Sequence, residues 1–211
     1  MPGKDRKGRQ ARGLPIAGRQ PCRPWQPSLL GPPDIPGFAY QPDLISPEEE
    51  RGLVRRLSVL DFKNFEFRGY MGSRRVVSFG FRYDFGDSKV HAAPDIPSFL
   101  LPLRQLAAQF AQIEAAALQH VLVTEYQPGA GIGWHKDRAA FRDVAGVSLL
   151  SPCRFRLRRR RAAGWQREAV LLEPRSAYLL RGPVREEWEH SIPPAESLRY
   201  SVTFRSLRSE A

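Results

Sequence analysis

Cysteine is almost absent from this sequence, since Cys22 and Cys153 are the only two among 211 residues. Two cysteines do not make a disulfide framework in a chain of this length, and no Cys-x-x-Cys pair offers the spacing of a structural zinc site. This scarcity argues against a small disulfide-stabilised secreted domain and favours a reducing, intracellular setting. We expect Cys153 to be a small buried apolar side chain.

Long apolar runs are missing as well. No stretch of the sequence approaches the ~18 consecutive apolar residues that mark a membrane-spanning helix. The basic N-terminus lacks the apolar segment of a secretory signal. We therefore expect a cytoplasmic protein that does not enter a membrane. Nothing in the sequence indicates a protein partner, and we expect a monomer.

Acidic side chains are outnumbered, because 22 Asp and Glu stand against 33 Lys and Arg and leave a net charge of +11. Residues 1–31 carry +6 of that charge, so the remainder of the chain is basic even without them. A molecule with this excess should attract polyanions, and nucleic acid is the expected partner.

The first 36 residues are rich in Pro, Gly and Arg and show no hydrophobic periodicity. This composition is typical of a disordered segment. We predict a basic tail over residues 1–36 and one domain over residues 37–208. The tail is either a solvated extension or an electrostatic arm for nucleic acid.

Helical signals are confined to the first half of the domain. The motif Ser46-Pro47-Glu48-Glu49 combines a capping box with proline at the first helical position, and the apolar stripe after it predicts a helix over about 47–60. A second stripe predicts a helix over about 97–116. Between them, the β-branched and aromatic residues of 74–85 predict a strand or an extended lip.

After residue 120 the pattern changes to short strands separated by turns. We expect strands at 121–126, 144–150, 153–159, 167–172, 177–181, 186–191 and 199–206. Two helices followed by a series of strands predict an α+β protein in which the helices cover one face of a β sandwich.

Two of the four histidines lie in informative surroundings. His135 and Asp137 are two residues apart and would share one face of a strand, and His190 follows 55 residues later. Two histidines and one carboxylate form the facial triad that holds iron in non-haem Fe(II) oxygenases. A lone His-x-Asp pair also arises by chance. We expect His91, in a polar loop, and His120, at the end of the second helix, to be structural.

The strand over residues 199–206 alternates between two sets of side chains. One face carries Arg199, Ser201, Thr203 and Arg205, and the other carries Tyr200, Val202 and Phe204. Arginines that point into a barrel are costly unless an anion pairs with them, and a dicarboxylate such as 2-oxoglutarate is such an anion. The alternative is that the arginines face solvent. Spacing alone leaves both interpretations open.

Taken together, these motifs resemble the ordered signature of the AlkB dioxygenases. The resemblance rests on Thr124-Glu125-Tyr126-Gln127-Pro128-Gly129, then His135-x-Asp137, then His190, then the strand from Arg199 to Arg205. It covers roughly residues 37–208. It implies a double-stranded β-helix, or jelly roll, buttressed by the two helices. It also implies Fe(II), with 2-oxoglutarate and O2 as cosubstrates.

The resemblance also implies roles for individual residues. The iron ligands would be His135, Asp137 and His190, and the 2-oxoglutarate contacts would be Tyr126, Thr124, Arg199, Ser201 and Arg205. Arg199 would pair with the distal carboxylate. The family often has Asn at the positions of Thr124 and Ser201. The implied activity is oxidative dealkylation of N-alkylated nucleobases, as in DNA alkylation repair, with release of succinate, CO2 and an aldehyde.

A base must leave its stack to reach a buried iron, which calls for aromatic and basic side chains around the pocket. Phe79, Tyr83 and Arg75 lie in the segment that resembles the family's substrate lip, and Trp134 precedes the first iron ligand. We assign these four residues to substrate binding. For Phe79, ordinary core packing explains the position equally well.

The most basic stretch of the domain runs from Arg154 to Arg161 and holds six arginines in eight residues. Such a strand could lie along a phosphate backbone, or its charge could keep an edge strand from pairing. Two further functions stay open. One is an AlkB-like dioxygenase that acts on RNA or on a protein side chain. The other is a non-catalytic nucleic-acid-binding β domain.

Overall fold

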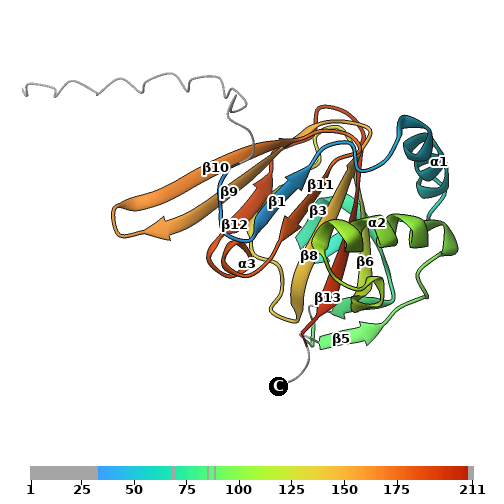
Figure 1. The fold of residues 1–211 in the computed structure, drawn as a ribbon, viewed down its shortest axis with the longest axis horizontal. Coiled ribbons are helices and arrows are strands. Elements are labelled where there is room, and N and C mark those ends of the chain that lie inside the picture. Colours follow the sequence, from blue (N-terminus) through green and yellow to red (C-terminus); the bar gives the residue numbers. More distant parts are fainter. Residues whose placement is uncertain (1–32, 68–69, 85, 88, 209–211) are drawn as a thin grey trace, which may run out of the picture.

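Two β-sheets form the body of the molecule (Figure 1). The computed structural model describes residues 33–208 except 68–69, 85 and 88. The larger sheet has the strand order β1-β11-β8-β13-β6-β3-β2, and each described pair is antiparallel. Its strands are β1 (Phe38–Gln41), β2 (Lys63–Phe67), β3 (Tyr70–Phe79), β6 (Leu118–Tyr126), β8 (Phe141–Leu149), β11 (Ala177–Leu180) and β13 (Arg199–Leu207).

The smaller sheet has the order β10-β9-β12-β7 and faces the larger one. Its strands are β7 (Ile132–His135), β9 (Cys153–Arg161), β10 (Gly164–Leu172) and β12 (Glu189–Ile192). Two antiparallel sheets packed in this way form a jelly-roll core, as predicted. A separate hairpin of β4 (Phe81–Asp84) and β5 (Lys89–Ala92) follows β3.

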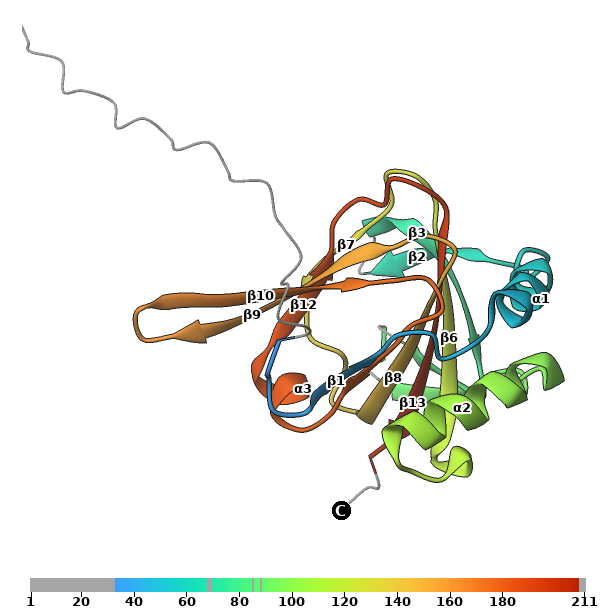
Figure 2. The same cartoon turned by 45° about the horizontal axis from the view of Figure 1, so that its top comes forward.

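Helices α1 (Pro47–Leu57) and α2 (Leu101–Ala111) cover the outer face of the larger sheet (Figures 1 and 2). Leu57 and Leu103 from the helices pack with Val121, Val202 and Phe204 of the sheet in one apolar cluster. Full burial of each such side chain stabilises the fold by about 1.5–3 kcal/mol. The helices therefore buttress the β core, as expected.

The helix boundaries follow local chemistry. At the start of α1 the Ser46 hydroxyl accepts from the Glu49 amide, and the Glu49 carboxylate accepts from the Ser46 amide, so the predicted capping box is present. The second predicted helix is broken, because α2 ends at Gln112, whose φ of 53° is left-handed. Short 3-10 turns over Ser98–Leu100 and Ala115–Ala117 occupy the rest of that range.

Strand β13 is buried on both faces, which decides between the two interpretations of its alternation. Tyr200, Val202 and Phe204 pack under the helices. Arg199 pairs in register with Tyr126 of β6, and that face meets the smaller sheet. The arginines of this strand point inward, so the solvent-facing alternative is wrong.

Several elements differ from the predictions. Strands β2, β5 and β7 and the short helix α3 (Pro183–Glu187) carried no clear signal, and α3 takes the beginning of the strand expected at 186–191. His120 lies inside β6 rather than at a helix end, and His91 lies in β5 rather than in a loop. Cys153 is buried, as expected.

The predicted tail and domain boundary need one correction. Residues 1–32, with Cys22, lie outside the described residues. Ile35 is 4% exposed and packs in the core, so the domain begins before residue 37. Among the described helices, none has the length and apolar character to cross a membrane.

Candidate active site

His135, Asp137 and His190 meet between the two sheets. His190 on β12 is the register partner of His135 at the end of β7, and the two ring centroids are 4.2 Å apart. Nε2 of His190 lies 3.9 Å from Oδ2 of Asp137, and the three residues each offer a ligand atom within 4.8 Å of the others. The structure thus brings the three predicted iron ligands to one point.

The protonation states of this triad suit a divalent metal. Nδ1 of His135 lies 2.9 Å from the carbonyl of Gly133, which can only accept, so Nδ1 carries the proton and Nε2 keeps its lone pair. Burial lowers the pKa of His135, and burial together with the neighbouring His135 lowers the pKa of His190 to about 3. Both imidazoles are therefore neutral at neutral pH.

The carboxylate of Asp137 is ionised. Burial alone would raise its pKa, but the charges of Arg205 and of the two histidines outweigh that effect and lower the pKa well below its usual range. Two neutral imidazoles and one carboxylate are the donor set of the facial iron triad. The residues present therefore fit Fe(II).

Arg205 lies beside the triad. Its Nη2 donates to Oδ1 of Asp137 at 3.2 Å, and its Nη1 lies 3.4 Å from Nδ1 of His120. Burial, with the charge of Arg205, lowers the pKa of His120 to about 2, so this histidine is neutral and structural. The Nε of Arg205 is buried without a hydrogen-bond partner among the described residues. Arg205 thus holds the carboxylate and still has one donor for a further group.

Arg199 lies on the same inner face as the triad. Its side chain is 1% exposed, its Nε donates to the Ser148 hydroxyl at 3.1 Å, and its guanidinium lies 5.1 Å from the Tyr126 ring centroid. Neither Nη1 nor Nη2 has a hydrogen-bond partner within the described part of the chain. A buried guanidinium with two free N–H edges is costly unless an anion binds there. A carboxylate fits this geometry.

Hydroxyl groups line the space around Arg199. Thr124 and Ser201 face each other across β6 and β13, and Ser148 pairs with Ser201 on the other side. Burial raises the pKa of Tyr126 and raises that of Tyr178 to about 12, so both phenols stay protonated. The inner face therefore offers neutral donors around one cationic centre, which suits a dicarboxylate such as 2-oxoglutarate.

Tyr178 keeps its place because residue 146 is glycine. Tyr178 on β11 is the register partner of Gly146 on β8. A Cβ added at residue 146 would overlap the phenol ring. Because Gly146 has no side chain, the Tyr178 ring can lie directly over β8. Sequence reasoning missed this pair, because nothing local links the two positions.

Arg185 on α3 fixes the turn that carries Asp137. Its guanidinium donates to the main-chain carbonyls of Asp137 at 2.9 Å, Arg138 at 2.6 Å and Arg142 at 3.3 Å, and also to that of Phe141. The four carbonyls span the turn between β7 and β8. Sequence reasoning missed Arg185, because main-chain acceptors leave no signature in the sequence.

Three of the four predicted substrate residues lie elsewhere. Phe79 is 8% exposed within the apolar cluster under the helices, so it is a core residue. Arg75 pairs with Glu125 at 2.7 Å on the outer face of the larger sheet. Trp134 alternates with His135 and points to the other face of the smaller sheet, under Arg156 and Arg158. None of these side chains lines the triad.

Arg74 lies close enough to His135 to lower its pKa, and Tyr83 contacts Arg138, the residue after Asp137. The Tyr83 ring centroid lies 5.2 Å from the guanidinium of Arg138, on the turn that Arg185 holds, so Tyr83 stays a candidate substrate contact. Arg74 is one of the charges that lower the pKa of His135. Because neighbouring residues of a strand face opposite ways, Arg74 replaces Arg75 as the basic residue beside the site.

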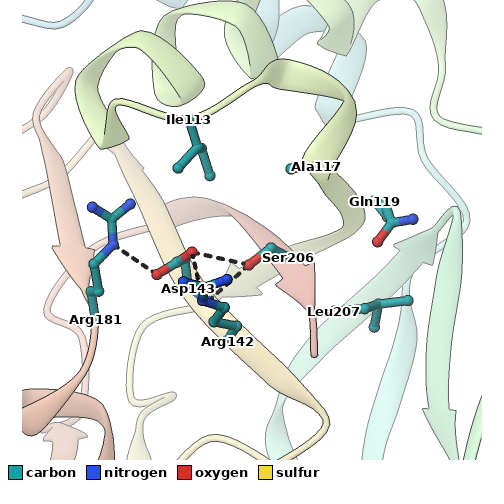
Figure 3. A pocket seen from close by; sticks show the side chains of 8 residues that line it. All are labelled: Ile113, Ala117, Gln119, Arg142, Asp143, Arg181, Ser206 and Leu207. Atoms are coloured by element: carbon teal, nitrogen blue, oxygen red, sulfur yellow. Dashed lines mark hydrogen bonds and ion pairs between the residues drawn. The ribbon is translucent and has the colours of Figure 1, made fainter. Parts of the chain in front are cut away.

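A surface pocket of about 430 Å³ lies apart from the triad, beyond the end of α2 (Figure 3). Arg181 donates to Oδ1 of Asp143 at 2.7 Å, and Ser206 donates to the other carboxylate oxygen at 3.3 Å. Arg181 also donates to the carbonyl of Ala111. These polar groups satisfy one another, so we assign the pocket a structural role.

Comparisons with known proteins agree with this geometry. The family model described as the 2OG-Fe(II) oxygenase superfamily matches residues 37–205. The chain is 28% identical to the "Alkylated DNA repair protein ALKBH8 homolog" of Arabidopsis thaliana over 83% of this chain and 60% of that protein. It is 33% identical to the "Alpha-ketoglutarate-dependent dioxygenase alkB homolog 7, mitochondrial" of Bos taurus over 53% of this chain and 54% of that protein. The chain thus spans less than two thirds of the length of each of these two relatives.

Solved structures share the fold at low sequence identity. The structure named "The structure of OsALKBH1" superposes with a TM-score of 0.61 and 17% identity, over 81% of this chain and 96% of that one. The structure of a Pseudomonas putida prolyl-4-hydroxylase superposes with a TM-score of 0.56 and 17% identity, over 82% of this chain and 94% of that one. At this identity the likeness establishes the shared jelly-roll fold.

Proposed function

The chain belongs to the 2OG-Fe(II) oxygenase superfamily and is AlkB-like, and on that premise we propose that it dealkylates N-alkylated nucleobases in DNA. As a dioxygenase of this superfamily it uses Fe(II), 2-oxoglutarate and O2. When bound, these supply the oxidising chemistry that hydroxylates a carbon attached to nitrogen, with release of succinate, CO2 and an aldehyde. The remaining steps belong to the protein, which binds, orients and shields the reactants.

The triad would hold the metal through one nitrogen of each histidine and one oxygen of Asp137. Oδ2 of Asp137 faces His190, whereas Oδ1 is engaged by Arg205, so the carboxylate is set to donate a single oxygen to the ion. The turn held by Arg185 fixes the direction of this carboxylate. With three protein donors, a bound ion would keep positions for cosubstrate and O2.

The pair of free Nη groups on Arg199 is the observation that carries the catalytic part of the proposal. These two donors point to an anion in the space between the sheets, and the triad borders the same space. Tyr126, Thr124 and Ser201 surround it with hydroxyl groups. We assign the distal carboxylate of 2-oxoglutarate to Arg199, with its other end toward the triad and Arg205.

The substrate part of the proposal rests on charge. The sequence carries +11, the charge of Arg74 acts on His135, and Arg138, which follows Asp137 in the chain, has its guanidinium beside the Tyr83 ring. A phosphate flanking a flipped base suits such cations, and the ring of Tyr83 suits the base. The name of the Arabidopsis relative, an alkylated DNA repair protein homolog, supports the same choice.

The test measures succinate and formaldehyde released from Fe(II), 2-oxoglutarate and O2 with three methylated substrates. These are single-stranded DNA with 1-methyladenine or 3-methylcytosine, the same sequence as RNA, and a methylated peptide. Formaldehyde formed in step with succinate on DNA, and lost in His135→Ala, is the expected result. A preference for RNA or for the peptide would replace the proposed substrate. Succinate without formaldehyde on all three would contradict dealkylation.

A non-catalytic nucleic-acid-binding domain, the third function considered from the sequence, loses its support. The superfamily match and the assembled triad identify the chain as a dioxygenase. A cytoplasmic location and a monomeric state stay predictions.

A further inference from the structure

The reverse face of the smaller sheet carries a row of alternating arginine and tryptophan side chains. We call it the Arg/Trp row, and its members are Arg156, Trp134, Arg158, Trp165 and Arg160. Arg158 lies between the two indoles, 4.3 Å from the centroid of Trp134 and 4.2 Å from that of Trp165. Arg156 and Arg160 extend the row. The Arg156 guanidinium lies 5.1 Å from the Trp134 ring centroid, and the Arg160 guanidinium lies 5.6 Å from that of Trp165.

The row and the metal triad share the same strands. Alternation puts His135 and His190 on the inner face and Trp134 on the outer face. Strand β7 is the edge of its sheet, so the row begins at the edge next to the iron ligands and runs along β9 toward the hairpin that projects from the body (Figure 1). A chain that leaves the triad around this edge would meet Trp134 first.

The row is built as a fixed cationic surface. Arg156 donates to the Ser191 hydroxyl at 3.0 Å and Arg158 to the Glu189 carboxylate at 2.6 Å, and the indoles hold the guanidinium planes between them. Side chains two residues apart on a strand repeat at about 6.8 Å, so the arginines of β9 present charge at regular intervals.

The charge of this face is left largely uncompensated within the described residues. Arg167 adds a further charge to the same face, and the Glu189 carboxylate pairs with Arg158. Burial, and the repulsion of Arg154 and Arg158, lower the pKa of Arg156. Strand β9 pairs with β10 on one side and with β12 on the other, so it is not an edge strand, and protection of an edge does not explain its arginines. A row of immobilised like charges is stabilised by a polyanion that runs along it.

We propose that the Arg/Trp row binds the phosphate backbone of the nucleic-acid strand whose base enters the iron site. This inference rests on the proposed function for its choice of partner. Guanidinium edges would contact successive phosphates, and the indoles would keep those edges in line rather than stack on bases. The row would then supply affinity without sequence preference, and the triad pocket would supply selectivity for the alkylated base.

The test is fluorescence anisotropy of the full chain with a labelled, unmodified single-stranded oligonucleotide, without cosubstrate. The row variant is Arg156→Gln/Arg160→Gln. The control is Arg51→Gln/Arg55→Gln on α1, which removes the same charge from exposed arginines at the far side of the molecule (Figure 2). Thermal unfolding of each variant verifies the fold.

We expect the row variant to weaken binding about tenfold at moderate salt and to reduce the slope of log K against log salt by about 1.4, the contribution of two single-strand phosphate contacts. The control should change affinity less than about twofold. Arg156→Lys/Arg160→Lys, which keeps the charge, should keep the slope. Equal losses in the row and control variants, or no loss in either, would overturn the inference.

The two proposals fail separately. Oligonucleotide binding that depends on the row, with no formaldehyde from any methylated substrate, would refute dealkylation alone. If methylated DNA yields formaldehyde but the row variant binds the oligonucleotide as tightly as the wild type, only the role of the row is refuted.

Discussion

Arg205 donates to Oδ1 of Asp137 at 3.2 Å across 68 residues of sequence, and this contact joins the two parts of the site. Asp137 belongs to the metal triad, and Arg205 lies on strand β13, which begins with Arg199. The contact leaves Oδ2 of Asp137 directed toward His190. The two ends of the cosubstrate space are thus set by one strand.

Loss of the Arg205 contact should weaken metal binding. Arg205→Gln removes the charge that orients Asp137, and groups that orient a metal ligand typically contribute about 10–100-fold in metal affinity. Anaerobic calorimetry with Mn(II), a redox-inert substitute for Fe(II), measures the effect. Arg208→Gln is the control, because Arg208 pairs with Glu186 at the surface at 3.0 Å. Equal affinities for the two variants would contradict the role of Arg205.

Loss of Arg199 should act on 2-oxoglutarate rather than on the metal. Arg199→Met removes both free Nη groups, and loss of a buried charge partner costs about 2–5 kcal/mol, or roughly thirtyfold and more in affinity. We expect the KM for 2-oxoglutarate to rise by at least that factor while Mn(II) affinity stays near wild type. A KM that does not change would show that the cosubstrate binds elsewhere.

The Gly146–Tyr178 contact predicts a rescue. Gly146→Ala should push the Tyr178 ring out of place, lower the Tm and weaken 2-oxoglutarate binding, because the new Cβ overlaps the ring. Tyr178→Leu provides the missing space. The double variant Gly146→Ala/Tyr178→Leu should therefore have a higher Tm than Gly146→Ala alone. Additive losses in Tm would mean that the two positions do not compete for space.

Stability below neutral pH should depend on Glu125. Burial would raise its pKa, but hydrogen bonds from Gln127, Arg75 and Tyr200 outweigh burial and lower it below 4.5. A lowered folded-state pKa adds stability that is present above pH 4.5 and is lost as the pH falls through the folded value.

Glu125→Gln should therefore flatten the decline of Tm between about pH 5 and pH 3. Exposed Glu196→Gln, which also removes one negative charge, should keep the wild-type decline. Parallel Tm curves for wild type and Glu125→Gln would contradict this assignment.

The parts of the site that were predictable from the sequence depend on short-range rules. The His-x-Asp spacing brought His135 and Asp137 together as predicted, although not on one strand, because β7 ends at His135 and Asp137 lies in the turn that follows. Alternation along β13 does put Arg199 and Arg205 on one face. Their order along the chain then identified the family. The helix at 47–57 was predictable for a similar reason, since its capping box is a four-residue motif.

The substrate side of the site was harder to predict because it depends on strand parity and on distant partners. A shift of one residue in β3 exchanges Arg74 for Arg75, and only the register with β6 decides which one faces inward. For Trp134, alternation with His135 already indicated the opposite face. Arg185 has no such signal, because its partners are carbonyl groups.

The most direct test of the central claim is the charge-transfer absorption that forms when 2-oxoglutarate chelates protein-bound Fe(II) under anaerobic conditions. We expect this band for the wild type, its loss in His135→Ala and Asp137→Ala, and its appearance in Arg199→Met only at a much higher concentration of 2-oxoglutarate. A wild-type protein without the band, or a band of equal strength in His135→Ala, would contradict an iron site at His135, Asp137 and His190.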